Sequence, residues 1–130
     1  MDVNIRILVV DDEPDIRQLL RILLENRGYQ VVEAASGEEA VRRLRTDPAY
    51  DLILMDIMMP KMDGLQAAKA IRAMQAERPD AEEIPIIALS ANAFAEDVQT
   101  SLDAGMNGHV SKSLNVAEVS KVIARNLNKS

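Results

Sequence analysis

Residues Asp51–Gly64 read DLILMDIMMPKMDG, and the interpretation of the whole chain depends on this stretch. It begins with an apolar run typical of a buried strand, ends that run with the carboxylate of Asp56, and then turns at Pro60 and Gly64. Open α/β sheets place ligand chemistry where a buried strand passes into a loop. Because aspartate also favours ordinary surface turns, the stretch alone leaves both interpretations open.

The composition fits one soluble α/β domain and excludes several kinds of site. The chain has 130 residues, of which 48% are hydrophobic, and this argues against disorder. It has no cysteine, which excludes disulfides, thiolate metal sites and cysteine nucleophiles. A net charge of −6 and an aromatic content of 2% disfavour direct binding of nucleic acid. No apolar run approaches the roughly 20 residues that span a bilayer, so we expect a cytoplasmic protein without membrane insertion.

Hydrophobic periodicity predicts five strands that alternate with five helices. The strands are expected at residues 5–10, 29–34, 52–55, 84–89 and 108–111. Helices then cover both faces of the sheet, so the strands should be parallel and fully buried. We therefore expect an α/β fold, a (βα)5 flavodoxin-like doubly wound parallel sheet with strand order 2-1-3-4-5, in one domain spanning residues 1–130.

Local signals place several helix ends. Pro14 suits the first turn of a helix, and Gly28 suits the end of that helix. Its apolar stripe consists of Ile16, Leu19, Leu20, Leu23 and Leu24. Ser36 and Glu39 have the spacing of a capping box, which predicts the start of a second helix. The fourth predicted helix carries the stripe Phe94, Val98 and Leu102.

Polar side chains stand at the carboxyl ends of four predicted strands. The first strand ends in Asp11, Asp12 and Glu13, the third in Asp56, the fourth in Ser90 and the fifth in Lys112. In the expected order the first and third strands are neighbours, so their acids share one crevice. Taken singly, each residue has an ordinary role as a helix cap, a strand end or a solvated lysine. Their coincidence at four strand ends indicates a site.

Three carboxylates in one crevice would repel one another unless a cation lay among them. Carboxylate oxygens without histidine or cysteine suit Mg²⁺, with Mn²⁺ as the alternative, far better than zinc. A lysine supplies a movable positive charge and a serine supplies a hydrogen-bond donor, so the pocket suits a dianionic tetrahedral group. An aspartate can itself accept a phosphoryl group as an acyl phosphate.

The segments ILVVDDEP, LILMDIMMPKMDG, PIIALSANA and GMNGHVSKS resemble the receiver domain of two-component response regulators, the CheY-like family. The likeness covers essentially the whole chain, and the lengths between the segments agree as well. It implies that Asp56 is phosphorylated. It also implies that Asp11, Asp12 and the backbone carbonyl of Met58 hold Mg²⁺ together with Asp56.

The resemblance also assigns residues on the other side of the phosphoryl group. Ser90 would donate to one phosphoryl oxygen and Lys112 would pair with another. Ser90 and the fifth-strand position occupied by His109 would take part in a two-state switch. Two positions depart from the family pattern. His109 replaces the usual Tyr or Phe, which puts an aromatic switch in question, and Ser113 replaces the usual proline after the lysine.

These features imply a phosphorelay receiver. The phosphoryl donor would be a phosphohistidine on a histidine kinase or a histidine phosphotransfer protein. The chain would catalyse its own phosphorylation and dephosphorylation without turning over a metabolite, so its standing as an enzyme stays open. The segments SANAF and AGMNGH look most like receivers of hybrid sensor histidine kinases. A reversible homodimer is compatible with the sequence.

Other functions remain as alternatives. A degenerate receiver would bind partners without phosphorylation, but its mark is loss of an acid or of the lysine, and all of these are present. A metal-dependent phosphohydrolase on a similar fold would need a second aspartate at the position of Met58. A flavodoxin-like cofactor site would need a phosphate-binding loop after the first strand, where this chain has the acidic DDEP.

Overall fold

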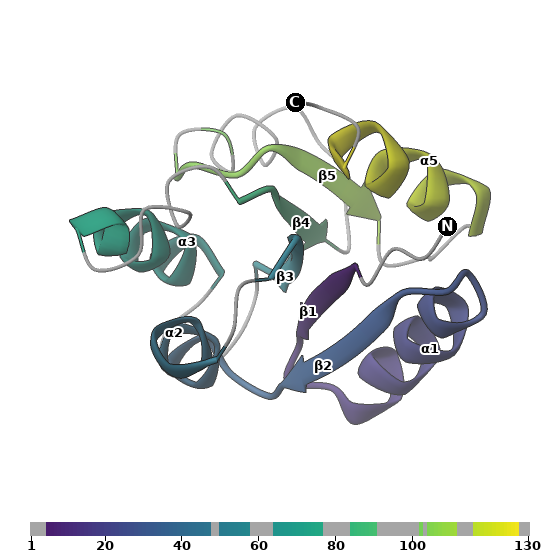
Figure 1. Ribbon diagram of the computed structural model, residues 1–130, viewed down its shortest axis with the longest axis horizontal. Coiled ribbons are helices and arrows are strands. Elements are labelled where there is room, and N and C mark those ends of the chain that lie inside the picture. Colours follow the sequence, from purple (N-terminus) through teal and green to yellow (C-terminus); the bar gives the residue numbers. More distant parts are fainter. Residues whose placement is uncertain are drawn as a thin grey trace.

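Five parallel strands form one sheet in the order β2-β1-β3-β4-β5 (Figure 1). The strands are β1 (Arg6–Val10), β2 (Gln30–Ala34), β3 (Leu52–Asp56), β4 (Ile86–Ser90) and β5 (Gly108–Ser111). The structure is a computed structural model that describes residues 5–47, 50–57, 64–76, 84–90, 102, 104–111 and 116–127. The expected fold class and strand order are confirmed.

Helices cover both faces of the sheet. They are α1 (Pro14–Glu25), α2 (Gly37–Thr46), α3 (Gly64–Arg72), which continues into the 3-10 turn η1 (Ala73–Ala76), and α5 (Val116–Leu127). Helices α1 and α5 lie on one face, whereas α2 and α3 lie on the other (Figure 1). The predicted fourth helix falls largely on residues 91–101, outside the described residues.

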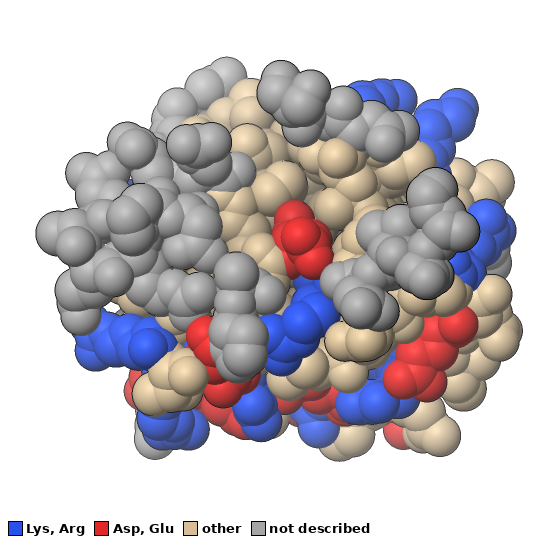
Figure 2. All heavy atoms as spheres, in the orientation of Figure 1, with Lys and Arg blue, Asp and Glu red and all other residues tan. Residues whose placement is uncertain are grey.

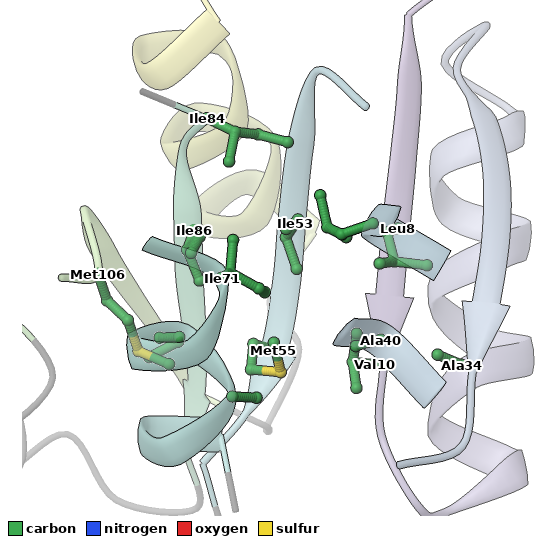
Figure 3. Packing of buried hydrophobic residues seen from close by; sticks show 14 of the residues in the cluster. Leu8, Val10, Ala34, Ala40, Ile53, Met55, Ile71, Ile84, Ile86 and Met106 are labelled. Atoms are coloured by element: carbon green, nitrogen blue, oxygen red, sulfur yellow. The ribbon is translucent and has the colours of Figure 1, made fainter. Parts of the chain in front are cut away.

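The alternation of side chains along the strands divides the core into two layers. The layer between the sheet and α2 and α3, shown in Figure 3, includes Leu8, Val10, Ile53, Met55, Ile86 and Ala88. The layer towards α1 and α5 includes Ile7, Val9, Leu52, Leu54, Ile87 and Leu89. Every residue of the central strand β3 is buried, which explains its continuous apolar sequence. Its last residue, Asp56, is therefore held by packing on both faces.

Helix α1 buries a narrower stripe than its sequence suggests. Leu20 and Leu24 are buried, and Ile16 and Leu23 are partly buried. Leu19 is 43% exposed, so the apolar stripe seen in the sequence is wider than the part that the sheet covers. A helix that packs on one flat sheet buries an arc of about 100°, and Leu19 falls at the edge of that arc.

Helix ends follow the signals in the sequence. Pro14 is the first residue of α1. The backbone N–H of Glu39 donates to the hydroxyl of Ser36 (3.1 Å), and the Glu39 carboxylate accepts from the N–H of Ala35 (2.8 Å). The Ser36 bond is the cap that the sequence predicts, whereas the Glu39 carboxylate bonds to the residue before the cap and not to the N–H of Ser36 itself. Gly28 follows α1 with a φ of 90°, a conformation that favours glycine.

A network around Arg72 ties together the amino-terminal ends of β4 and β5. The Arg72 guanidinium donates to the carbonyl oxygen of Ile84 (2.8 Å) and twice to that of Gly105 (3.0 and 2.7 Å). It also donates to the side-chain oxygen of Asn107 (2.7 Å). That oxygen accepts from the N–H of Ile86 (2.9 Å), and the N–H of Asn107 donates to the Ile86 carbonyl (2.7 Å). Asn107 thereby extends the β4–β5 pairing by one position.

A second network lies at the same edge, between β1 and β3. The N–H of Arg6 donates to the carboxylate of Asp51 (2.8 Å), and the N–H of Asp51 donates to the carbonyl oxygen of Arg6 (2.8 Å). The Arg6 guanidinium lies 4.5 Å from the centre of the Tyr50 ring. The Tyr50 hydroxyl donates to the carboxylate of Asp47. Burial, aided by this hydrogen bond, raises the pKa of Tyr50 to about 12.

Candidate functional site

Three acids from two neighbouring strands meet at the carboxyl edge of the sheet. Asp11 directly follows β1 and Asp56 ends β3, and the register pairs Val10 with Met55, which sets the two acids side by side. Both are fully buried, whereas Asp12 is exposed. Carboxylate oxygens of Asp11, Asp12 and Asp56 all lie within 4.8 Å of one another. The structure thus brings together Asp11, Asp12 and Asp56, the three acids that the strand order was expected to place side by side.

Hydrogen bonds fold the segment after β1 back on itself and fix Asp11. Its N–H donates to the carbonyl oxygen of Ala34 (3.1 Å), which extends the pairing of β1 with β2. One oxygen of its carboxylate accepts from the N–H of Glu13 (2.9 Å). The Arg17 guanidinium donates to the Asp11 carbonyl oxygen (2.7 Å). The carboxylate is thus oriented by its own loop and by the first turn of α1.

Arg17 belongs to an ionic network that sequence reasoning missed. Glu33, on the edge strand β2, accepts from Arg17 (3.0 Å) and from Arg21 (2.7 Å). The hydrogen bond from Arg21 is the largest cause that holds the pKa of Glu33 below its usual value, and Arg17 adds to it. Figure 2 shows basic and acidic side chains alternating along the edge where α1, β2 and α2 lie. The available signal was the charged Glu33 inside the predicted strand at residues 29–34.

Asp56 is fixed by the elements on both sides of it. The N–H of Ile57 donates to the carbonyl oxygen of Leu89 (3.1 Å), so β3 stays paired with β4 one residue beyond the acid. The N–H of Gly64, the first residue of α3, donates to the carbonyl oxygen of Ile57 (3.4 Å). The backbone is therefore still bonded to the sheet at Ile57, and Gly64 bonds to that same residue.

The remaining predicted site residues are described in part or not at all. Ser90 is the last residue of β4 and its backbone is paired with Ser111 of β5, but its side chain lies outside the described set. His109 is paired with Ala88 by its backbone, and its side chain is likewise outside. Met58, Lys112 and Ser113 fall outside the described residues.

The donor set of the acidic cluster suits a hard divalent cation. All three candidate ligands are carboxylates, and the chain has no cysteine that could add a soft donor. Two of the three are fully buried, where several negative charges are unfavourable without a counter-ion. Oxygen-only sites of this kind favour Mg²⁺-like ions over zinc or copper. The residues present therefore fit a divalent metal.

The sequence of residues 7–124 matches the family model of the response regulator receiver domain. The chain belongs to this family. The receiver domain is 40% identical over 120 residues to the sensor protein GacS of Pseudomonas syringae pv. syringae, covering 92% of this chain and 13% of that protein. It is 37% identical to the alkaline phosphatase synthesis transcriptional regulatory protein PhoP of Bacillus subtilis, covering 89% of this chain and 45% of PhoP. The receiver domain thus spans only a small part of the sensor kinases that it matches.

Solved structures agree with this assignment. The receiver domain of the sensor histidine kinase PA1611 from Pseudomonas aeruginosa PAO1 has a TM-score of 0.86 and 35% identity, covering 98% of this chain and all of that one. Its active site cleft contains a coordinated magnesium ion. The chemotaxis protein CheY4 of Vibrio cholerae has a TM-score of 0.85 and 32% identity, covering 95% of this chain and 98% of that one.

The comparisons show a signalling receiver of two-component systems, a domain that occurs both in hybrid sensor kinases and in response regulators. Receivers of this class interact with histidine kinases or phosphotransfer proteins. No relative named above favours the degenerate alternative. Among the described residues, no helix is long and apolar enough to cross a membrane.

Proposed function

We propose that the receiver accepts a phosphoryl group on Asp56 from a phosphohistidine, in a reaction that depends on Mg²⁺. The observation that supports this most directly is the carboxylate cluster at the carboxyl edge of the sheet. Asp56 is fully buried at the end of the central strand, and its carboxylate lies within 4.8 Å of those of Asp11 and Asp12. The same three acids would hold the metal.

The proposed transfer is a substitution at phosphorus. A carboxylate oxygen of Asp56 forms the new O–P bond, the N–P bond of the phosphohistidine breaks, and the departing imidazole nitrogen keeps the electron pair. When bound, Mg²⁺ neutralises negative charge on the phosphoryl oxygens. The network of Ala34, Glu13 and Arg17 holds Asp11 in place before the donor arrives, so little reorganisation is needed during transfer. Attack by water on the acyl phosphate later releases phosphate and restores the carboxylate.

Further residues complete the proposal on the strength of the family motifs. The backbone carbonyl of Met58 would be a metal ligand, and Ser90 and Lys112 would bind phosphoryl oxygens. Ser90 and His109 would carry the conformational switch to an output surface. We include Mn²⁺ as a substitute for Mg²⁺, because it shares the preference for carboxylate oxygens.

The setting of the domain is also part of the proposal. The partner would be a histidine kinase or a histidine phosphotransfer protein, because the relatives include sensor kinases and response regulators. We assign residues 1–130 to one receiver domain; the family match covers residues 7–124. A cytoplasmic location, a reversible homodimer and the lack of direct nucleic-acid binding stay predictions from the sequence.

Phosphorylation of the intact protein tests the proposed function. Wild type, Asp56→Asn and Asp51→Asn would be incubated with acetyl phosphate and Mg²⁺, and then with a phosphorylated histidine phosphotransfer protein. Mass spectrometry counts the phosphoryl groups. Asp51 is a matched control because it is an exposed aspartate at the opposite edge of the sheet.

We expect one phosphoryl group on wild type and on Asp51→Asn, and none on Asp56→Asn. Chelation of the divalent ion should abolish the gain, and added Mn²⁺ should restore it. A phosphoryl group retained by Asp56→Asn would overturn the assignment of the acceptor. A wild-type protein that gains no phosphoryl group from either donor would favour the degenerate receiver.

A further inference from the structure

Gly64 lies directly against the backbone of the proposed phosphoryl acceptor. A Cβ atom built on Gly64 would stand 2.2 Å from the carbonyl oxygen of Asp56, 2.9 Å from its carbonyl carbon and 2.7 Å from the Cα of Ile57. Real Cβ contacts essentially never fall below 3.0 Å. All three clashing atoms belong to backbone, so no side-chain rotation can relieve the overlap.

Other glycines of the domain differ in this respect. A Cβ on Gly28 would meet nothing within 4 Å. On Gly105 it would meet the Arg72 side chain, and on Gly108 the nearest atom, at 2.9 Å, is the terminal methyl of Ile87. The absence of a side chain at Gly64 therefore serves the contact between α3 and the end of β3. Gly28 and Gly105 are the described glycines with a positive φ. Gly64 is not one of them, so it is not needed for a left-handed turn.

The contact joins the end of β3 to the start of α3. Gly64 touches the Asp56 carbonyl and donates to the Ile57 carbonyl, while the N–H of Ile57 donates to Leu89 of β4. The peptide unit between Asp56 and Ile57 is thus held between the sheet and the first turn of α3. A displacement of this peptide unit would shift the Asp56 Cα, and with it the carboxylate that the same Cα carries.

We propose that Gly64 is a positioning residue for the Asp56 carboxylate, through its close approach to the Asp56 carbonyl. The inference rests on the function proposed for Asp56. An alanine would force the two backbones apart by about 1 Å, since the built contact of 2.2 Å must open beyond 3.0 Å. Displacement by about 1 Å can slow a reaction by about 100-fold, and loss of support around a metal ligand lowers metal affinity by about 10- to 100-fold.

The alternative is a glycine needed for folding alone, and a series of glycine variants separates the two roles. The variants are Gly64→Ala, Gly28→Ala, which strains a positive φ in open space, and Gly108→Ala, which crowds a core side chain far from the acids. For each variant the metal-free Tm, the dissociation constant for Mg²⁺ by calorimetry, and the rate of phosphorylation by acetyl phosphate would be measured.

We expect Gly64→Ala to weaken Mg²⁺ binding at least about tenfold and to slow phosphorylation by about 10- to 100-fold at a temperature where it is folded. For the two control variants, the Mg²⁺ affinity and the phosphorylation rate should stay within about twofold of wild type. This should hold even if their Tm falls as far as that of Gly64→Ala. A folded Gly64→Ala protein with wild-type Mg²⁺ affinity and rate would overturn the inference. A wild type that neither binds Mg²⁺ nor reacts would instead overturn the proposed function of Asp56.

A measurement on the wild-type protein keeps the proposal testable if Gly64→Ala does not fold. In protein labelled with ¹⁵N at glycine, Mg²⁺ followed by beryllofluoride, which mimics a phosphoryl group on aspartate, would be added. The amide resonance of Gly64 should shift at both steps, because its backbone touches that of Asp56, whereas Gly28 should not respond. An unmoved Gly64 resonance would refute the coupling.

Discussion

Replacing Asp56 by asparagine should stabilise the metal-free protein. The substitution removes one of three carboxylates whose oxygens lie within 4.8 Å of one another, and asparagine keeps nearly the same shape. Asp56 and Asp11 are both fully buried, so water screens their repulsion poorly. In the absence of a cation the folded state carries this repulsion and the unfolded chain does not.

The magnitude follows from the distance between the oxygens. At 4.8 Å, the upper limit of the separations between the candidate ligand oxygens, two unit charges repel by about 3.5 kcal/mol at an effective dielectric constant of 20. Hydrogen bonds to the carboxylates and water at the exposed Asp12 reduce this value, and we expect a net gain of about 1–2 kcal/mol in the free energy of unfolding. For 130 residues this corresponds to a rise in Tm of about 4–8 °C.

Thermal unfolding followed by circular dichroism, first with chelator and then with Mg²⁺, provides the assay. Wild type should gain stability with Mg²⁺ because a ligand that binds only the folded state shifts the equilibrium. Asp56→Asn should begin higher and gain less. Asp15→Asn removes the same charge from an exposed position in the first turn of α1 and should not raise Tm. A metal-free Asp56→Asn protein that melts at or below wild type would refute the reasoning.

Three further predictions concern stability. Because Arg21 holds the pKa of Glu33 below its usual 4.5, ionised Glu33 stabilises the fold above that pH, and this contribution is lost on acidification. In urea titrations, Glu33→Gln should therefore lose less stability than wild type between about pH 5 and 3. Equal losses would contradict this. Since burial raises the pKa of Tyr50 from 10.0 to about 12, the unfolded chain releases this proton at a lower pH than the folded protein does. The free energy of unfolding should therefore fall as the pH rises above about 10. Tyr50→Phe should show a smaller fall, and its absorption spectrum should lack the phenolate that appears near pH 12. Leu54→Ala, in the centre of the sheet, should lower the free energy of unfolding by about 2–5 kcal/mol, whereas Leu19→Ala, 43% exposed, should lower it by less than about 1 kcal/mol; similar losses would refute the assigned packing.

The strand order and the acidic cluster could be predicted because both follow from short-range patterns. A strand buried on both faces is apolar throughout, so the acid that ends it stands out, and the switch point of the topology then brings Asp11 and Asp56 together. The inward stripe of α1 was predicted less well. Periodicity marks the apolar side of a helix, but it does not say how much of that side the partner surface covers, and Leu19 lies outside the covered part.

Contacts between distant residues could not be predicted in the same way. Arg72 bonds to the carbonyl oxygen of Gly105, 33 positions away, and neither residue carries a local signal for the other. Gly64 was interpreted as a turn residue, which explains only part of its role, because the reason for glycine there is the approach of α3 to the Asp56 carbonyl. Arg17 has an ordinary helical position in sequence, and its bond to Glu33, 16 positions away, joins α1 to β2.

Because of the networks at the amino-terminal ends of the strands, the two ends of the sheet differ in how easily their hydrogen bonds open. There, the N–H groups of Ile86 and Asn107 are bonded across β4 and β5, and Arg72 anchors the same segments from α3. Breaking these bonds would open the start of the β4–β5 pairing, so these amides should exchange with solvent more slowly than the amide of Gly64. At the opposite edge, the N–H of Gly64 is held by a single 3.4 Å bond and can exchange through a smaller fluctuation. Rearrangement around the acids can therefore proceed while the far edge keeps the sheet intact.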